Sequence, residues 1–160
     1  LLWNLHHRIS LVRPKLGELV AFRNVVREIP NDTAVDEASI EAIIRGAGLR
    51  LVYIGEARVF NKGAENVRDF LKQRRRIAIG HLHLKHKQDY SVSTTSWKNI
   101  LGPLIRETRW GGKTLAWTMG AILLEIYARA SGHFDFFVRK RNPFVWDIAA
   151  STKDLTGSSK

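Results

Sequence analysis

Apolar residues recur at helical spacing in several parts of the chain. In residues 31–48, three isoleucines fall on one side of a predicted helix that opens with an acidic pair. Asp32 or Thr33 can cap its start, and Gly46 or Gly48 can end it. We therefore expect a helix with carboxylates in its first turn.

A second and longer helix is predicted after Asn66, which can cap its start. The apolar stripe of this helix consists of Val67, Phe70, Leu71, Ala78 and Leu82. A short helix is expected around residues 100–107.

Residues 114–131 form the most apolar segment, but its uncharged run is too short to cross a bilayer core. Two interpretations remain: a buried core helix, or a helix that lies in a membrane interface. The anchors of an interfacial helix would be Trp110, Trp117, Arg106, Arg109 and Lys113.

Three short runs have the pattern of strands: residues 19–22, 49–54 and 57–61. In the second of these, "LRLVYI", the alternation places Leu49, Leu51 and Tyr53 on one side of the predicted strand. Together with the predicted helices, these runs favour an α/β fold.

The composition limits the possible chemistry. The chain has 160 residues, a net charge of +11 and no cysteine, so it favours anionic partners and excludes disulfides and thiolate metal sites. It begins without methionine or a signal-peptide pattern and has the character of an excised piece. The sequence has no recognised nucleic-acid-binding motif, so its positive charge alone does not favour nucleic acid as the partner. A basic anion- or nucleic-acid-binding module without catalysis stays an alternative.

The most basic stretch of the long predicted helix is "QRRR". Gln73 and Arg76 share a helix face, while Arg74 and Arg75 fan to the sides. A guanidinium group can bind two phosphate oxygens at once, so these residues could hold a diphosphate. A solvated charged face is the simpler alternative.

Two further groups of side chains were considered for chemistry. His81, His83 and His86 do not share one helix face and do not predict a metal site. Asp36 and Glu37 are candidates for acid or base catalysis, although acidic residues also favour helix starts because of the helix dipole.

The order of these motifs resembles a known family. The pieces "VDEASIEAIIRGAG", "LRLVYI", "GEARVFNKGAENVRDF" and "KQRRRIAIGH" follow one another as in the carboxyl-terminal half of the catalytic domain of membrane-associated family 2 glycosyltransferases, which include cellulose, hyaluronan and chitin synthases. In that family an acidic motif carries the catalytic base, and a "QxxRW" helix closes the site. Ile77 stands at the tryptophan position and Ala64 at a proline position.

The resemblance implies an inverting transfer of a sugar from a nucleotide-diphosphate donor to the hydroxyl group of a glycan or lipid-linked acceptor. It implies the acceptor-side half of a GT-A-like α/β domain, with Asp36 or Glu37 as the base. It also implies that Gln73 and Arg76, helped by Arg74 or Arg75, contact the diphosphate and acceptor, and that Gly17 lies at the acceptor entrance.

The resemblance further implies parts outside this chain. An amino-terminal nucleotide-binding half would carry a DxD motif that holds Mg or Mn, and this sequence has no ligand motif for that cation. Residues 1–88 would form the acceptor-side half, 89–153 a helical and possible membrane-interfacial region, and 154–160 a flexible tail. The protein would work at the cytoplasmic face of the cell membrane, and the isolated chain is expected to be inactive.

Overall fold

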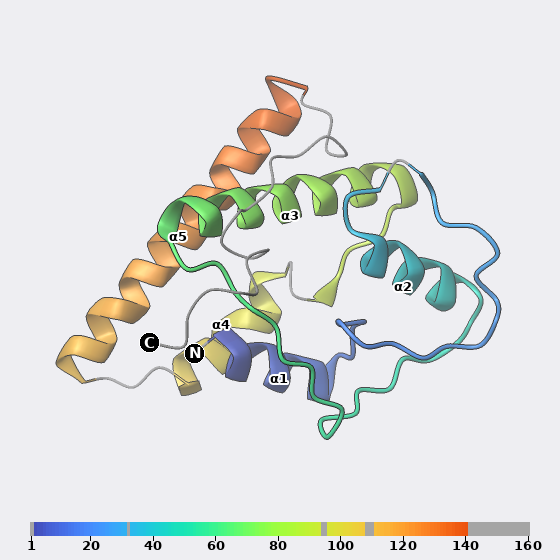
Figure 1. Ribbon diagram of the computed structural model, residues 1–160, viewed down its shortest axis with the longest axis horizontal. Coiled ribbons are helices and arrows are strands. Elements are labelled where there is room, and N and C mark those ends of the chain that lie inside the picture. Colours follow the sequence, from blue (N-terminus) through green and yellow to red (C-terminus); the bar gives the residue numbers. More distant parts are fainter. Residues whose placement is uncertain (1, 32, 94–95, 108–110, 141–160) are drawn as a thin grey trace.

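The computed structural model describes residues 2–31, 33–93, 96–107 and 111–140. Its regular elements are helices, joined by long irregular segments (Figure 1). They are α1 (Leu2–Val12), α2 (Asp36–Gly46), α3 (Val67–Gln88), α4 (Trp97–Glu107) and α5 (Gly112–Phe137). α3 runs across the molecule, with α5 crossing it and α2 below its carboxyl-terminal half.

The prediction of an α/β fold was wrong, because the described residues contain no strand. The three runs expected as strands, 19–22, 49–54 and 57–61, are irregular and largely exposed; Phe60, for example, is 95% exposed. A strand needs a partner that satisfies its backbone hydrogen bonds. Local alternation cannot supply that partner, and the described chain does not provide one.

The helix predicted after the capping residues is confirmed as α2. Gly48 adopts a left-handed conformation with φ of 74° after its end. The amide of Gly48 donates to the Arg45 carbonyl, and the amide of Leu49 donates to the Ile44 carbonyl. This pattern satisfies carbonyls that the helix end would otherwise leave free. Thr33 does not cap the helix directly; its hydroxyl instead bonds to Ser39.

The long helix after Asn66 is also confirmed. The Asn66 side chain accepts a hydrogen bond of 2.8 Å from the amide of Asp69, as an amino-terminal cap does. The predicted apolar stripe is only partly correct, because Val67 is exposed while Ile79 and Leu84 are buried. α3 packs on two sides, against α2 and against α5.

A small core joins α2 and α3. It consists of Val35, Ala38, Leu84 and Val92, with Tyr90 packed against it. Gly80 lets the two parts approach closely: a Cβ atom there would lie 2.8 Å from Cγ1 of Val35. The same contact holds the start of α2 against the middle of α3.

α3 and α5 also cross at close range. A Cβ atom at Gly132 would lie 2.9 Å from Cβ of Ala78 and 3.2 Å from the Arg75 carbonyl oxygen. One side of α5 packs on α3 and the other is exposed, so the helix is only partly buried. Within the described ranges, each helix is too short or too polar to cross a membrane.

The Gly132 contact leads to a stability prediction. Replacing a glycine inside a helix by alanine normally stabilises it by up to about 1 kcal/mol, because glycine has the more flexible backbone. Gly132→Ala is expected to reverse that sign and destabilise by roughly 1–2 kcal/mol, since α3 and α5 must move apart. Urea unfolding measures the difference.

The same helix supplies the matched control. Outside the helix's own turns, no atom in the described part of the chain lies within 4 Å of a Cβ built at Gly120. Gly120→Ala should therefore stabilise the protein or leave it unchanged. If both variants raise the midpoint of unfolding equally, the close helix crossing does not exist in solution.

α1 was not predicted. Its buried residues Leu5, Ile9 and Ser10 face the body, and the helix packs against α4. His7 shares a hydrogen bond of 2.8 Å between its Nδ1 and the Tyr53 hydroxyl, so α1 also holds part of the irregular segment that follows α2.

Candidate functional site

The structure brings the acidic pair of α2 towards the "QRRR" face of α3. Asp36 and Glu37 lie exposed in the first turn of α2. Arg76 lies half-buried on α3, where burial lowers its pKa while the carboxylates of Glu37 and Asp36 act in the opposite direction. Carboxylate and guanidinium therefore act on each other across the two helices.

The close approach at Gly80 explains this placement. Gly80 follows Arg76 by four residues, so both lie on the same face of α3. Val35, which contacts the Gly80 position, directly precedes Asp36. Gln73 is three residues before Arg76 and belongs to the same face by helical spacing, and it is half-buried.

A third segment, residues 14–17, is tied to α2 by two hydrogen bonds. The amide of Leu16 donates to Oε2 of Glu41 over 2.8 Å, and Nη2 of Arg45 donates to the Pro14 carbonyl over 2.9 Å. Between them lies Lys15, whose pKa is lowered by burial although Glu41 and Glu37 favour its charged form. Gly17 is exposed, and none of the described residues has an atom within 4 Å of a Cβ built on it.

Arg74 and Arg75 are both ion-paired with acidic residues of α5. Arg74 forms a two-pronged ion pair with Glu125 of α5, at 2.6 Å and 2.8 Å. Arg75 is ion-paired with Asp135, whose side chain is completely buried. These two arginines thus hold α3 to α5, and the expectation that they assist at a diphosphate stays a prediction.

Glu41 is a site-supporting residue that sequence reasoning missed. Its carboxylate is 1% exposed and accepts hydrogen bonds from the Leu16 amide and, at 2.5 Å, from the Tyr90 hydroxyl. Burial and this hydrogen bond raise the pKa of Tyr90. A signal was present in the sequence: Glu41 is spaced three residues from both Ala38 and Ile44, so it had to face the buried side of the helix.

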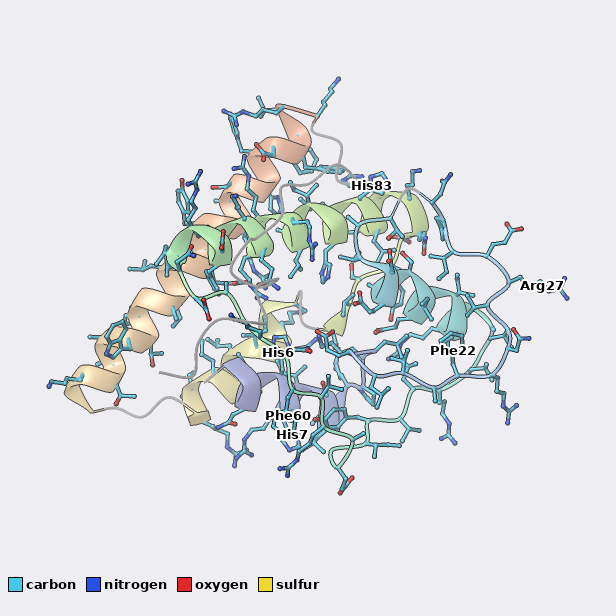
Figure 2. All side chains as sticks on the ribbon, in the orientation of Figure 1. His6, His7, Phe22, Arg27, Phe60 and His83 are labelled. Atoms are coloured by element: carbon cyan, nitrogen blue, oxygen red, sulfur yellow. The ribbon has the colours of Figure 1, made fainter. Side chains whose placement is uncertain are left out.

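His6 of α1 and His81 of α3 lie in a polar interior beside the site. His6 is on the side of α1 that faces α3, whereas its neighbour His7 is on the opposite side (Figure 2). Burial and the charge of Lys15 lower the pKa values of His6 and His81 to about 4, and Arg74 and Arg129 act in the same direction. Both imidazoles are therefore neutral near pH 7.

His83 and His86 lie against an aromatic ring of α5. His86 stacks on Phe136 with ring centroids 5.3 Å apart, and His83 meets the same ring edge-on. Among the described residues no three His, Asp or Glu side chains are grouped closely enough to hold a metal ion.

A hollow of about 270 Å³ lies between residues 30–39 and the last turns of α3, and its polar lining includes Thr33, His83 and Lys87. It does not include the acidic pair or Arg76. Of the predicted anchors for an interfacial helix, Trp117, Arg106 and Lys113 are exposed, and Arg109 and Trp110 lie outside the described residues.

Comparisons of the chain with models of protein families, with curated proteins and with solved structures found no match.

Proposed function

We propose that this chain forms the acceptor-side part of a site that transfers a sugar, with inversion, from a nucleotide-diphosphate donor to a hydroxyl group. The observation that carries the proposal is the close contact between the Gly80 position of α3 and Val35, which directly precedes Asp36 and so places the acidic pair beside the face of α3 that carries Arg76. Those residues are far apart in the sequence, and glycosyl transfer requires both kinds: a carboxylate to receive a proton and a cation beside the leaving phosphate.

In this mechanism, Asp36 or Glu37 accepts the proton of the acceptor hydroxyl. The hydroxyl oxygen forms a bond to the anomeric carbon while the bond from that carbon to the diphosphate oxygen breaks. The diphosphate leaves with the electron pair, and its growing charge is stabilised by Arg76. Because the attack comes from the side opposite the leaving group, the anomeric configuration inverts.

Lys15 adds a second cation that sequence reasoning did not identify. It lies within electrostatic range of Glu37, and Glu41 and Arg45 of α2 hold the segment that carries it. Gly17, two residues later, leaves open space in which an acceptor can approach the backbone. The nucleotide itself is not assigned to these helices, and any cation on the diphosphate would be held outside the described residues.

The test compares single variants of the full-length gene product. Release of nucleotide diphosphate is measured with a panel of nucleotide sugars and sugar acceptors, for the wild type and for Asp36→Asn and Glu37→Gln. The variant that lacks the base should lose about 100-fold in kcat, the usual contribution of general base catalysis. Arg76→Gln should lower kcat as well, because it removes charge from the leaving group.

Glu56→Gln is the matched control, since Glu56 is exposed in the irregular segment between α2 and α3. It should leave transfer unchanged. Retention of full activity in both Asp36→Asn and Glu37→Gln would overturn the proposal. If no sugar is transferred and the protein instead binds nucleic acid with a steep salt dependence, the chain is a basic binding module.

A further inference from the structure

α5 carries an apolar surface on the side away from α3. It consists of Met119, Leu123, Ile126, Tyr127 and Phe134, each 45–62% exposed. At 100° per residue these five positions fall within an arc of about 100°. We call this surface the outer face of α5. Continuous exposed apolar surface of this kind marks an interaction site rather than ordinary scatter.

The acidic side chains of α5 are withdrawn from this surface. The helix has two, Glu125 and Asp135, which are 19% and 0% exposed and turn towards α3. Glu125 is paired with Arg74 and Arg129, and Asp135 with Arg75 and Arg139. The ion pairs that fasten α5 to α3 therefore also remove negative charge from the side that faces outward.

Positive charge flanks the outer face at both ends. Lys113 is exposed in the first turn of α5, and Arg139 and Lys140 are exposed two and three residues after its last residue. The guanidinium of Arg139 lies 5.3 Å from the centre of the Phe134 ring, at the edge of the apolar surface. Apolar side chains between cationic ends match a lipid interface with anionic headgroups.

We propose that the outer face of α5 docks on an anionic lipid surface, with its helix axis parallel to the membrane plane. The apolar side chains enter the boundary between headgroups and acyl chains, and Lys113, Arg139 and Lys140 contact the headgroup phosphates. A parallel orientation fits the observation that no described helix can span a membrane. Charge complementarity is what favours lipid over a second protein surface. This proposal does not depend on the proposed sugar transfer.

Vesicle co-sedimentation of the full chain tests the proposal. Vesicles of phosphatidylcholine with one-third phosphatidylglycerol should bind the protein at least tenfold more tightly than phosphatidylcholine alone, and added salt should weaken the binding. The double variant Leu123→Glu/Tyr127→Glu should lose at least tenfold in affinity. Both side chains are more than 60% exposed, so the helical circular dichroism should be unchanged.

Val52→Glu/Phe60→Glu is the matched control, because it also replaces two exposed apolar residues by glutamate, away from α5. Its binding should equal that of the wild type. A second pair of variants tests the cationic residues. Lys113→Glu/Lys140→Glu should weaken vesicle binding, and Lys85→Glu/Lys87→Glu, at the end of α3, should weaken it less.

Two results would overturn the proposal. The first is that Leu123→Glu/Tyr127→Glu binds vesicles as tightly as the wild type, or that it loses no more affinity than the control Val52→Glu/Phe60→Glu. The second is a wild-type protein that forms dimers without lipid, is made monomeric by Leu123→Glu/Tyr127→Glu, and does not bind anionic vesicles. In that case the outer face of α5 joins two copies of the chain.

Discussion

Acidification from about pH 7 to pH 4 is expected to destabilise the protein strongly, because two histidines are held neutral in the folded state. The pKa values of His6 and His81 fall from 6.5 to about 4 on folding. Between these values the unfolded chain binds more protons than the folded chain, so the free energy of unfolding decreases as the pH falls. The loss is of the order of 3 kcal/mol for each histidine.

The physical cause is burial first and neighbouring charge second. Lys15, Arg74 and Arg129 act on both imidazoles, and Glu125, which opposes them at His6, is already paired with the two arginines. Protonating either histidine would therefore place an additional cation beside existing cations in a poorly hydrated interior.

Urea unfolding at a series of pH values measures this effect. The window from pH 6.5 to about 5 is the informative one, since the pKa of Glu125 is lowered from 4.5 by its arginines and its protonation matters only below that range. His6→Gln/His81→Gln should flatten the pH dependence within the window. His133→Gln, on the exposed side of α5, should leave the slope unchanged. A double variant with the wild-type slope would show that these histidines do not govern the acid response.

Local features of the fold could be predicted from the sequence. Asn66 predicted the start of α3, and Gly46 or Gly48 predicted the end of α2, because capping and left-handed turns depend on residues within a few positions of each other. The same local reasoning failed for residues 49–54. Their alternation would describe a strand only if a partner strand lay alongside, and alternation carries no information about a partner.

The candidate site, too, has features that could be predicted from the sequence and others that could not. The shared face of Gln73 and Arg76 follows from helical spacing, and the acidic start of α2 follows from its sequence. That the two meet depends on the close approach at Gly80, a tertiary contact. The roles of Arg74 and Arg75 were not predictable, because their partners lie on α5, 51 residues later in the case of Arg74 and Glu125. A charged run on one helix does not reveal whether it faces solvent, ligand or another helix.

The ion pair between Arg75 and Asp135 is expected to be essential for the packing of α3 on α5. Asp135 is fully buried, while the Arg75 side chain is 32% exposed. Removing one partner of a buried pair leaves an uncompensated charge, so Asp135→Leu should destabilise by about 3 kcal/mol. Arg139, at 3.5 Å from Asp135, would lose its partner too.

A double-mutant cycle distinguishes the ion pair from simple loss of packing. Arg75→Met/Asp135→Leu replaces both charges by apolar side chains, and such replacements are often close to neutral. The double variant should therefore recover more than half of the loss caused by Asp135→Leu alone, as measured by urea unfolding at neutral pH. The parallel cycle Lys62→Met/Glu65→Leu removes a pair at 3.1 Å in which Glu65 is 60% exposed, and each step should change stability by less than about 1 kcal/mol. If the two cycles give equal coupling, the buried pair contributes no more than a surface one, and the arrangement of α3 against α5 must depend on the close contact at Gly132 instead.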